Sequence, residues 1–555
     1  MIAALLLSVL AFAGIAGAAD PPRGAMKVPG GGAPCIRDRT APASYTSCSV
    51  VANGLQGAMT AVVSPDGKNV YVTGFQSDSV ASFSRDESTG ALTPLPGAAA
   101  CMKDRTSTAG AQCGSTAIGI KVAIGLAISP DGKSVYVAGV GSDAVAAFSR
   151  NPDTGALTQL PGAGACIKNE TAAADNPCPT SGKGLAGTRW VTVSADGRNV
   201  YTATAAGHAI AAFKRDTSTG ALTQLPGAGA CIEDVTDNIP GSGVPDGTGK
   251  ESCPQRANGM AYPRTITLSP DGKNAYTATD FGGAIAEFKR DPSTGALTQL
   301  RGADECIKDT LSAPGYTHCP QSTPSLNWAW QVAVAPDGAN VYASSDEGMA
   351  VTSFSRDPAT GALHPLPGAG ACIREWNAPQ STQCRVSGNG LAGAEGISVS
   401  PDSHTIYIAA FHGMAVSAFS RDPGTGALTQ LPGGAGCIED SRAPHHTTSR
   451  CDAKADGLYQ PRMVALSPDG RNAYVPSSVG STLTVISVSG KGAVLHAKPL
   501  TGAGGKGSSS TASKIGIAVL AVVLLVAAAA LLAARRRGAL RRRGPRRKRR
   551  SYYRM

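Results

Sequence analysis

One turn-and-strand motif occurs seven times in this sequence. Residues 64–72, SPDGKNVYV, place Ser, Pro, Asp and Gly in a tight turn and follow them with an alternating strand. The copies begin at intervals of 65 to 67 residues, with one interval of 75, at Ser64, Ser129, Ser194, Ser269, Ala335, Ser400 and Ser467. A fixed period of this length is typical of a repeat architecture.

Each repeat predicts four short strands. In the second repeat they are GLAIS, SVYVAG, DAVAAFSR and ALTQLP, separated by turns and one short loop. Seven such units without a polar cap at either end predict a closed ring, because an open stack would leave a sheet uncovered at both ends. We therefore expect an all-β, seven-bladed β-propeller of four-stranded antiparallel blades over residues 20–500. Tandem sandwich domains of about 100 residues are the alternative, but they do not fit the period.

The start of the chain carries a stray copy of the outer strand. GAMKVPGGGAPC at 24–35 aligns with GALTQLPGAGAC at 155–166, so the N-terminal segment is expected to complete the last blade. The seventh repeat also ends in a weaker copy, GAVLHAKPLTGAGG. The sequence leaves open which of the two is paired in the ring.

The cysteines form seven close couples, one in each repeat. The couples are Cys35 with Cys48, Cys101 with Cys113, Cys166 with Cys178, Cys231 with Cys253, Cys306 with Cys319, Cys372 with Cys384, and Cys437 with Cys451. An even count and one couple per repeat in an exported chain predict seven local disulfides, each closing the connection from an outer strand to the next inner strand. None of the couples has the Cys-x-x-Cys spacing of a zinc site, so we expect no metal there.

Both ends of the chain carry segments outside the repeats. Residues 1–19 are an apolar run ending in small residues, which predicts a secretory signal peptide. Residues 501–514 are a Gly/Ser-rich linker, and the uncharged residues 515–534 are long enough for a transmembrane helix at about 1.5 Å per residue. The basic residues 535–555 predict a cytoplasmic tail. We expect a single-pass plasma-membrane protein with an extracytoplasmic propeller.

The motif KPLTG at 498–502 offers an alternative to membrane anchoring. It resembles a sortase sorting motif, and such signals also have an apolar run and a basic end. Attachment to the cell wall is therefore the second hypothesis for localisation.

The net charge of +11 arises in the C-terminal tail. Residues 535–555 hold 12 of the 50 Lys and Arg and no acid, which leaves 38 basic residues against 39 acids in the rest of the chain. A nearly neutral body does not favour a nucleic-acid partner. The neighbouring His445 and His446 could hold a metal, but we expect neither a metal nor a cofactor.

The repeats disagree with one another at the start of the inner strand. Five residues before each turn lie Met59, Ile124, Arg189, Arg264, Trp330, Glu395 and Arg462. Because the inner strands of a propeller surround one axis, these side chains are expected to converge on the entrance of the central channel. The short loops between second and third strands would add Asp280, Asp346, Glu347 and His412 on the same face.

This set of residues predicts a binding site for an anionic or polar ligand. Arginine would be a bidentate donor to the ligand and Trp330 a stacking wall. In the alternative interpretation, the arginines and carboxylates pair with one another and only fill a wet channel.

The unit SPDGKNVYV…DSVASFSRD…TGALT resembles the seven-bladed propeller family of lactonases. This family includes 6-phosphogluconolactonase-like proteins and YVTN-type surface repeat proteins, and the resemblance covers about residues 24–500. In lactonase relatives one inner strand carries Pro-Arg-His before the turn. Here Pro263 and Arg264 are followed by Thr265, and Asp280 stands where the relatives have Glu.

Two functions follow from the resemblance and the site. The protein could be a module at the cell surface that binds an extracellular small molecule or protein. As a lactonase-type hydrolase, it would use Arg264 and Arg462 to hold an acidic lactone while Asp280 or Glu395 handled protons. The missing histidine removes the usual proton-transfer group at pH 7, so the sequence favours binding.

Overall fold

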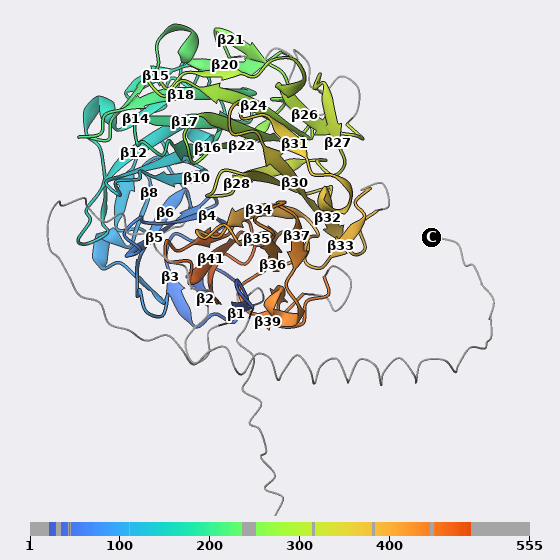
Figure 1. Cartoon of the computed structure of the whole chain (residues 1–555). Coiled ribbons are helices and arrows are strands. Elements are labelled where there is room, and N and C mark those ends of the chain that lie inside the picture. Colours follow the sequence, from blue (N-terminus) through green and yellow to red (C-terminus); the bar gives the residue numbers. More distant parts are fainter. Residues whose placement is uncertain are drawn as a thin grey trace, which may run out of the picture. The chain divides into compact units, whose positions relative to one another are not determined.

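Seven similar sheets surround a common axis in the computed structural model (Figure 1). The structure describes residues 22–489, apart from 29–34, 43, 45, 110–111, 236–250, 313–316, 380–382 and 444–448. The inner strands of successive blades contact one another around the axis, and the seven-bladed β-propeller is confirmed.

The strands of blades 1 to 3 follow the repeat. Blade 1 contains β4 (Ala58–Val63), β5 (Asn69–Gly74), β6 (Ser79–Arg85), β7 (Leu92–Pro94), β8 (Cys101–Asp104) and β9 (Ser115–Ala117). Blade 2 contains β10 (Ala123–Ile128), β11 (Ser134–Gly139), β12 (Ala144–Arg150), β13 (Leu157–Gln159), β14 (Cys166–Asn169) and β15 (Thr180–Gly182). Blade 3 contains β16 (Thr188–Val193), β17 (Asn199–Thr204), β18 (Ala209–Arg215), β19 (Leu222–Gln224), β20 (Cys231–Asp234) and β21 (Gln255–Ala257).

Blades 4 to 6 have the same order. Blade 4 contains β22 (Pro263–Leu268), β23 (Asn274–Thr279), β24 (Ala284–Arg290), β25 (Leu297–Gln299), β26 (Cys306–Asp309) and β27 (Gln321–Thr323). Blade 5 contains β28 (Ala329–Val334), β29 (Asn340–Ser345), β30 (Ala350–Arg356), β31 (Leu363–Pro365), β32 (Cys372–Glu375) and β33 (Val386–Gly388). Blade 6 contains β34 (Ala394–Val399), β35 (Thr405–Ala410), β36 (Ala415–Arg421), β37 (Leu428–Gln430), β38 (Cys437–Asp440) and β39 (Ala453–Ala455).

Short 3-10 helices interrupt the outer strand of six blades, and one more lies in a loop of blade 2. They are η2 (Gly97–Ala99), η3 (Val140–Ser142), η4 (Gly162–Gly164), η5 (Gly227–Gly229), η6 (Gly302–Asp304), η7 (Gly368–Gly370) and η9 (Gly433–Ala435). In blade 1, Pro96 lacks an N–H for the strand ladder and Gly97 has φ +57°, so the chain turns there. The fourth strand is therefore split into β7 and β8, both antiparallel to β6.

The blades contain more strands than the four antiparallel ones that we expected. Each blade has a further short strand at its outer edge. In blade 1, β9 pairs with β8 in parallel. A parallel neighbour requires the chain to travel back to the start of β8 before it continues. The disulfide between Cys101, at the start of β8, and Cys113, two residues before β9, pins this return.

All seven predicted disulfides are present, and each closes a loop within one repeat. They join Cys35 to Cys48, Cys101 to Cys113, Cys166 to Cys178, Cys231 to Cys253, Cys306 to Cys319, Cys372 to Cys384, and Cys437 to Cys451. The Cα atoms of each pair lie 4.9 to 5.4 Å apart, which is the separation that a disulfide requires. All 14 cysteines lie among the described residues, and none is free.

The N-terminal segment is paired in blade 7, in agreement with the first of the two alternatives that the sequence left open. Blade 7 contains β40 (Ala465–Leu466), β41 (Asn472–Ser477) and β42 (Thr482–Val488) together with β1 (Met26–Lys27), β2 (Cys35–Asp38) and β3 (Val50–Ala52). Both β1 and β2 pair antiparallel with β42, and Met26 lies opposite Val488. The competing C-terminal copy lies outside the described residues.

The two faces of the ring carry different connections. We call the face with the repeated turns the turn face, and the opposite face, where the loops from second to third strands meet the starts of the inner strands, the mouth face. The turns form as expected: Ser64 Oγ donates to Asp66 at 2.5 Å and accepts the Asn69 N–H at 2.9 Å. The hydrophobic cores lie between neighbouring sheets, where Tyr201 of blade 3 and Phe288 of blade 4 are fully buried in one cluster.

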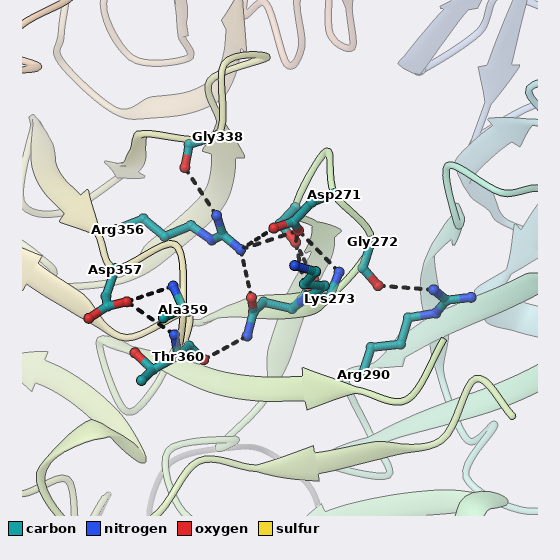
Figure 2. A network of polar contacts seen from close by, with 12 residues as sticks. Asp271, Gly272, Lys273, Arg290, Gly338, Arg356, Asp357, Ala359 and Thr360 are labelled. Atoms are coloured by element: carbon teal, nitrogen blue, oxygen red, sulfur yellow. Dashed lines mark hydrogen bonds and ion pairs between the residues drawn. The ribbon is translucent and has the colours of Figure 1, made fainter. Parts of the chain in front are cut away.

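In six of the seven blades, an arginine at the end of the third strand fastens the blade to the preceding one on the turn face, as Figure 2 shows for Arg356. Arg356 donates from Nε to the Tyr276 hydroxyl at 2.9 Å and forms an ion pair with Asp271 at 3.0 Å. It also donates to the Asn274 amide oxygen at 2.7 Å and to the Gly338 carbonyl at 3.2 Å. Equivalent contacts are made by Arg85, Arg150, Arg215, Arg290 and Arg421.

Several predicted segments lie outside the described residues. They are the signal peptide, the linker, the transmembrane helix, the basic tail and the pair His445 and His446. In residues 22–489, less the gaps given above, no helix has the length and apolar character needed to cross a membrane.

Candidate functional site

In four blades the variable residue lies in a bulge at the start of the inner strand. In blades 3 to 6 the pairing with the second strand skips one residue, and these residues are Arg189, Arg264, Trp330 and Glu395. A bulge redirects the side chain of the extra residue and often occurs next to a site. In these four blades the bulge is a physical reason why the residue five positions before the turn points toward the channel.

Trp330 is the centre of the group at the channel mouth. The Cζ atom of Arg264 lies 4.0 Å from the centre of the indole ring, and those of Arg189 and Arg462 lie 5.7 and 5.8 Å away. Guanidinium groups at these distances are attracted by the negative face of the ring. The indole is 8% exposed, so it is a wall of the mouth that three cations line.

Two of the three arginines are paired with buried carboxylates. Arg462 donates from one nitrogen to both oxygens of Glu395, at 2.7 and 2.9 Å, and from Nε to Ser478 at 2.9 Å. Arg264 forms an ion pair with Asp280. Glu395 and Asp280 are only 1% and 2% exposed, so each carboxylate depends on its arginine for compensation.

The third arginine has no such partner. Among the described residues, the Arg189 guanidinium has neither a hydrogen bond nor an ion pair, and only Trp330 lies within cation–π distance. Burial, and secondarily the like charge of Arg264, lower the pKa of Arg189 to about 9. Arg189 is therefore a half-buried cation without a directly paired carboxylate among the described residues.

Burial also changes the carboxyl groups at the mouth. It raises the pKa of Glu395 to about 8 against the opposing effect of Arg462. Burial likewise raises the pKa of Asp346, while the charge of His412 opposes the shift. His412 Nε2 lies 3.5 Å from Asp346 Oδ1, and its side chain is half exposed. The Asp346–His412 pair adjoins the mouth as expected, and Glu347 beside it is exposed.

The cavity enclosed by the mouth residues is small. The space between the side chains is about 20 Å³, which is room for a single water molecule. It is lined by Met59, Thr60, Ile124, Arg189, Trp190, Arg264, Thr265, Trp330, Arg462 and Met463. A ligand larger than a water molecule would therefore lie on the mouth, against the arginines.

The position where lactonase relatives have histidine carries no proton-transfer group. Thr265 is 2% exposed, and its hydroxyl donates to the Trp330 carbonyl at 3.3 Å. This hydroxyl forms a hydrogen bond to the inner strand of the next blade. It does not titrate near pH 7. The carboxyl groups of Glu395 and Asp280 are the titratable acids next to the arginines.

Sequence reasoning missed the aromatic residues that surround the arginines. The Arg462 Cζ atom lies 3.8 Å from the Phe411 ring centre, and that of Arg264 lies 5.4 Å from the Tyr262 ring centre. Both aromatic residues lie close in sequence to predicted site residues, Phe411 next to His412 and Tyr262 two residues before Arg264. Their aromatic character in otherwise small-residue loops was the available signal.

The fold and the mouth define a seven-bladed β-propeller with stapled inter-blade loops and an arginine-lined channel entrance. No family model matches the sequence, and no curated protein matches it. Solved structures with a similar fold include a putative 6-phosphogluconolactonase from Bacteroides uniformis, with 18% identity and a TM-score of 0.44 over 69% of this chain and 85% of that one.

Two further solved structures have the same range of similarity. The periplasmic gluconolactonase of Pseudomonas aeruginosa has 15% identity and a TM-score of 0.42 over 67% of this chain and 83% of that chain. Hydrazine synthase of Kuenenia stuttgartiensis has 17% identity and a TM-score of 0.43 over 80% of this chain and 99% of that chain. Similarity at this level concerns the propeller fold, which hosts many functions.

Proposed function

We propose that the protein is a membrane-anchored, extracytoplasmic β-propeller that binds an anionic small molecule at the channel mouth. The lack of a directly paired carboxylate at Arg189 supports this proposal above all. Arg264 and Arg462 each have a carboxylate partner within the protein, and Arg189 has none. A carboxylate or phosphoryl group of a ligand would supply the missing partner, because a guanidinium donates two parallel hydrogen bonds to such a group.

The surroundings of Arg189 favour an anion over a neutral ligand. Three guanidinium groups lie around Trp330, and two carboxylates, Asp280 and Glu395, balance two of them. A bound anion would stabilise the charged form of Arg189, which burial and its arginine neighbours now destabilise. The Trp330 ring would form a wall beside the body of the ligand.

The point where the chain leaves the propeller is compatible with anchoring. The Val488 N–H donates to the Arg471 carbonyl at 2.7 Å, which places the end of β42 on the turn face. The mouth lies on the opposite face. A tether that begins at the turn face would leave the mouth accessible to extracellular ligands.

The binding proposal is tested by calorimetric titration of the full chain with phosphate, citrate and gluconate. We expect at least one anion to bind, and Arg189→Ala to weaken its binding by about tenfold or more, since a charged hydrogen-bonded pair is worth about 1.5–3 kcal/mol. Arg198→Ala is the matched control, because Arg198 is an exposed arginine in the turn of the same blade. Equal binding by wild type and Arg189→Ala would contradict the proposal.

Lactonase-type hydrolysis is the second candidate function. It is favoured by the arginine–carboxyl pairs, because a guanidinium can stabilise the oxygen of a lactone carbonyl while a carboxylate accepts a proton from the attacking water. Both oxygens of Glu395 accept hydrogen bonds from Arg462, whereas Arg264 pairs with one oxygen of Asp280, so Asp280 is the better candidate base. Both groups are engaged by arginines.

A panel of charged and neutral lactones separates the two functions. We expect no turnover by the full chain. Robust hydrolysis that Asp280→Asn and Arg264→Ala abolish would replace binding with catalysis, whereas hydrolysis that persists in both variants would point to a contaminating enzyme and leave binding in place.

A further inference from the structure

One backbone position beside the mouth is left-handed in all seven blades. It lies two residues before the variable mouth residue, and its φ is between +53° and +68°. Glycine occupies it in three blades, as Gly57, Gly187 and Gly393, and larger residues occupy it in the other four, as Val122, Tyr262, Trp328 and Gln460. A side chain in the left-handed region costs conformational free energy that glycine does not.

Blades 4 and 5 place aromatic residues at this position, next to each other around the ring. Tyr262 has φ +61° and Trp328 has φ +54°. Strained residues of this kind concentrate at functional sites, where the surrounding structure holds them in place. Local backbone preference favours glycine at this position and does not explain a tryptophan there. We therefore expect another role for the Trp328 side chain.

Trp328 is held outward by other aromatic rings. Its ring centre lies 6.3 Å from that of Phe281, and Phe281 lies 5.2 Å from Tyr262 in an edge-to-face contact. Tyr262 is fixed in turn, because its N–H donates to His208 Nδ1 at 2.9 Å. Burial lowers the pKa of His208 to about 4, so its ring is neutral at pH 7 and Nδ1 can accept this bond.

Trp328 stays accessible despite this support. Within the described part of the chain, three large apolar side chains are exposed by more than a third, and they are Val235, Leu311 and Trp328. Trp328 is the aromatic one of the three, and it is 36% exposed. An indole ring that contacts Phe281 and keeps a third of its surface exposed offers flat apolar surface to a ligand.

Polar groups flank the exposed indole. Asn327 precedes it and is exposed, and Glu347 is exposed in the neighbouring loop. That loop lies directly against Trp328, because the Asp346 N–H donates to the Trp328 carbonyl and the Gly348 N–H to the Asn327 carbonyl, both at 3.1 Å. An amide and a carboxylate beside an aromatic face can accept hydrogen bonds from hydroxyl groups while the ring packs against C–H groups.

We propose that this site, formed by Trp328, Asn327 and Glu347, binds the pyranose ring of a neutral oligosaccharide. The ring stacks its C–H face on the indole, and its hydroxyls donate to Asn327 and Glu347. The exposed carboxylate of Glu347 disfavours an anion. The guanidinium of Arg264, which lies over Tyr262, disfavours a cation.

The test compares Trp328→Gly with the wild-type full chain against cellotetraose, chitotetraose, maltotetraose and mannotetraose. We expect at least one of these sugars to bind, and Trp328→Gly to weaken that binding about tenfold or more. The melting temperature is expected not to fall, since glycine fits the left-handed position and removes strain. Trp328→Tyr, which keeps an aromatic face, should retain binding within about threefold.

Two controls separate this site from the channel mouth and from other exposed apolar groups. Leu311→Ala and Arg189→Ala should both bind the sugar as the wild type does. Absence of binding to all four sugars, equal binding by Trp328→Gly, or loss of sugar binding in Arg189→Ala would overturn the proposal. Binding of choline at Trp328 in competition with the sugars would reassign the site to a cationic ligand.

Discussion

Single residues carry much of the asymmetry of this repetitive protein. Glu287 on β24 illustrates this, because the corresponding residue in the other blades is small or apolar. Those residues are Ser82, Ala147, Ala212, Ser353, Ala418 and Val485. Glu287 is fully buried, and one carboxyl oxygen accepts the Leu363 N–H at 2.8 Å, while the other has no hydrogen bond to a described residue.

The buried carboxyl of Glu287 makes stability depend on pH. Burial raises its pKa from 4.5 to about 9, so the folded protein keeps the proton that the unfolded chain loses. Its contribution is complete below about pH 4.5 and is lost progressively as the pH rises toward 9. Glu287→Gln should therefore have a higher free energy of unfolding than wild type at pH 8, by on the order of 1–3 kcal/mol. The difference should be much smaller at pH 5. Urea unfolding at both pH values measures it.

The control for Glu287→Gln is the same carboxyl-to-amide change at an exposed position. Glu347→Gln serves this purpose, because Glu347 is exposed on the mouth face. Its stability should follow that of wild type at both pH values. Parallel pH curves for wild type and Glu287→Gln would mean that Glu287 is ionised in the folded protein.

At the scale of the element, the arginine contact that joins blade 7 to blade 6 is more exposed than the equivalent contacts of the other blades. The third strand of blade 7 ends in Val488 where six blades have arginine. Arg23, just before β1, takes that place and forms an ion pair with Asp402 at 2.7 Å, and the Tyr407 hydroxyl donates to the Gly24 carbonyl at 3.0 Å. The Arg23 side chain is 47% exposed, whereas that of Arg356 is 2% exposed.

This difference in exposure predicts unequal effects of removing the two arginines. Arg23→Ala should cost about 0–1 kcal/mol, as exposed ion pairs do. Arg356→Ala removes a buried cation with four hydrogen-bond partners and should cost about 2–4 kcal/mol. Thermal unfolding of both variants measures the effects. Equal losses of stability in the two variants would contradict this prediction. They would show that Arg23 stabilises the contact of blade 7 with blade 6 as strongly as Arg356 stabilises the contact of blade 5 with blade 4.

At the scale of the whole molecule, function depends on which face is presented to the surroundings. The disulfide loops, the mouth and Trp328 lie on the mouth face, and the chain leaves β42 on the turn face. We expect the full chain in the membrane fraction of its cells, with the propeller cleaved by protease added outside. Recovery in the cell wall, trimmed after Thr501, would replace the membrane anchor with sorting to the wall.

The sequence by itself predicted the architecture because the repeat is a local signal. Turn chemistry at Ser64 and its copies sets strand lengths, and the period sets the number of blades. The disulfides followed because each couple, such as Cys101 and Cys113, closes a loop within one repeat. The convergence of Arg189, Arg264 and Trp330 followed from ring symmetry.

Only the tertiary structure decided which residues are partners. Arg356 pairs with Asp271, 85 residues earlier, and Arg462 pairs with Glu395 of the preceding blade, and nothing local in the sequence specifies either distance. The bulges that redirect the mouth residues and the parallel outer strands depend on neighbouring strands. Arg189 lacks a carboxylate partner because Asp280, an acid close enough to act on its charge, forms its ion pair with Arg264. Local sequence determines turns and strands, whereas compensation of buried charge depends on what three-dimensional packing brings together.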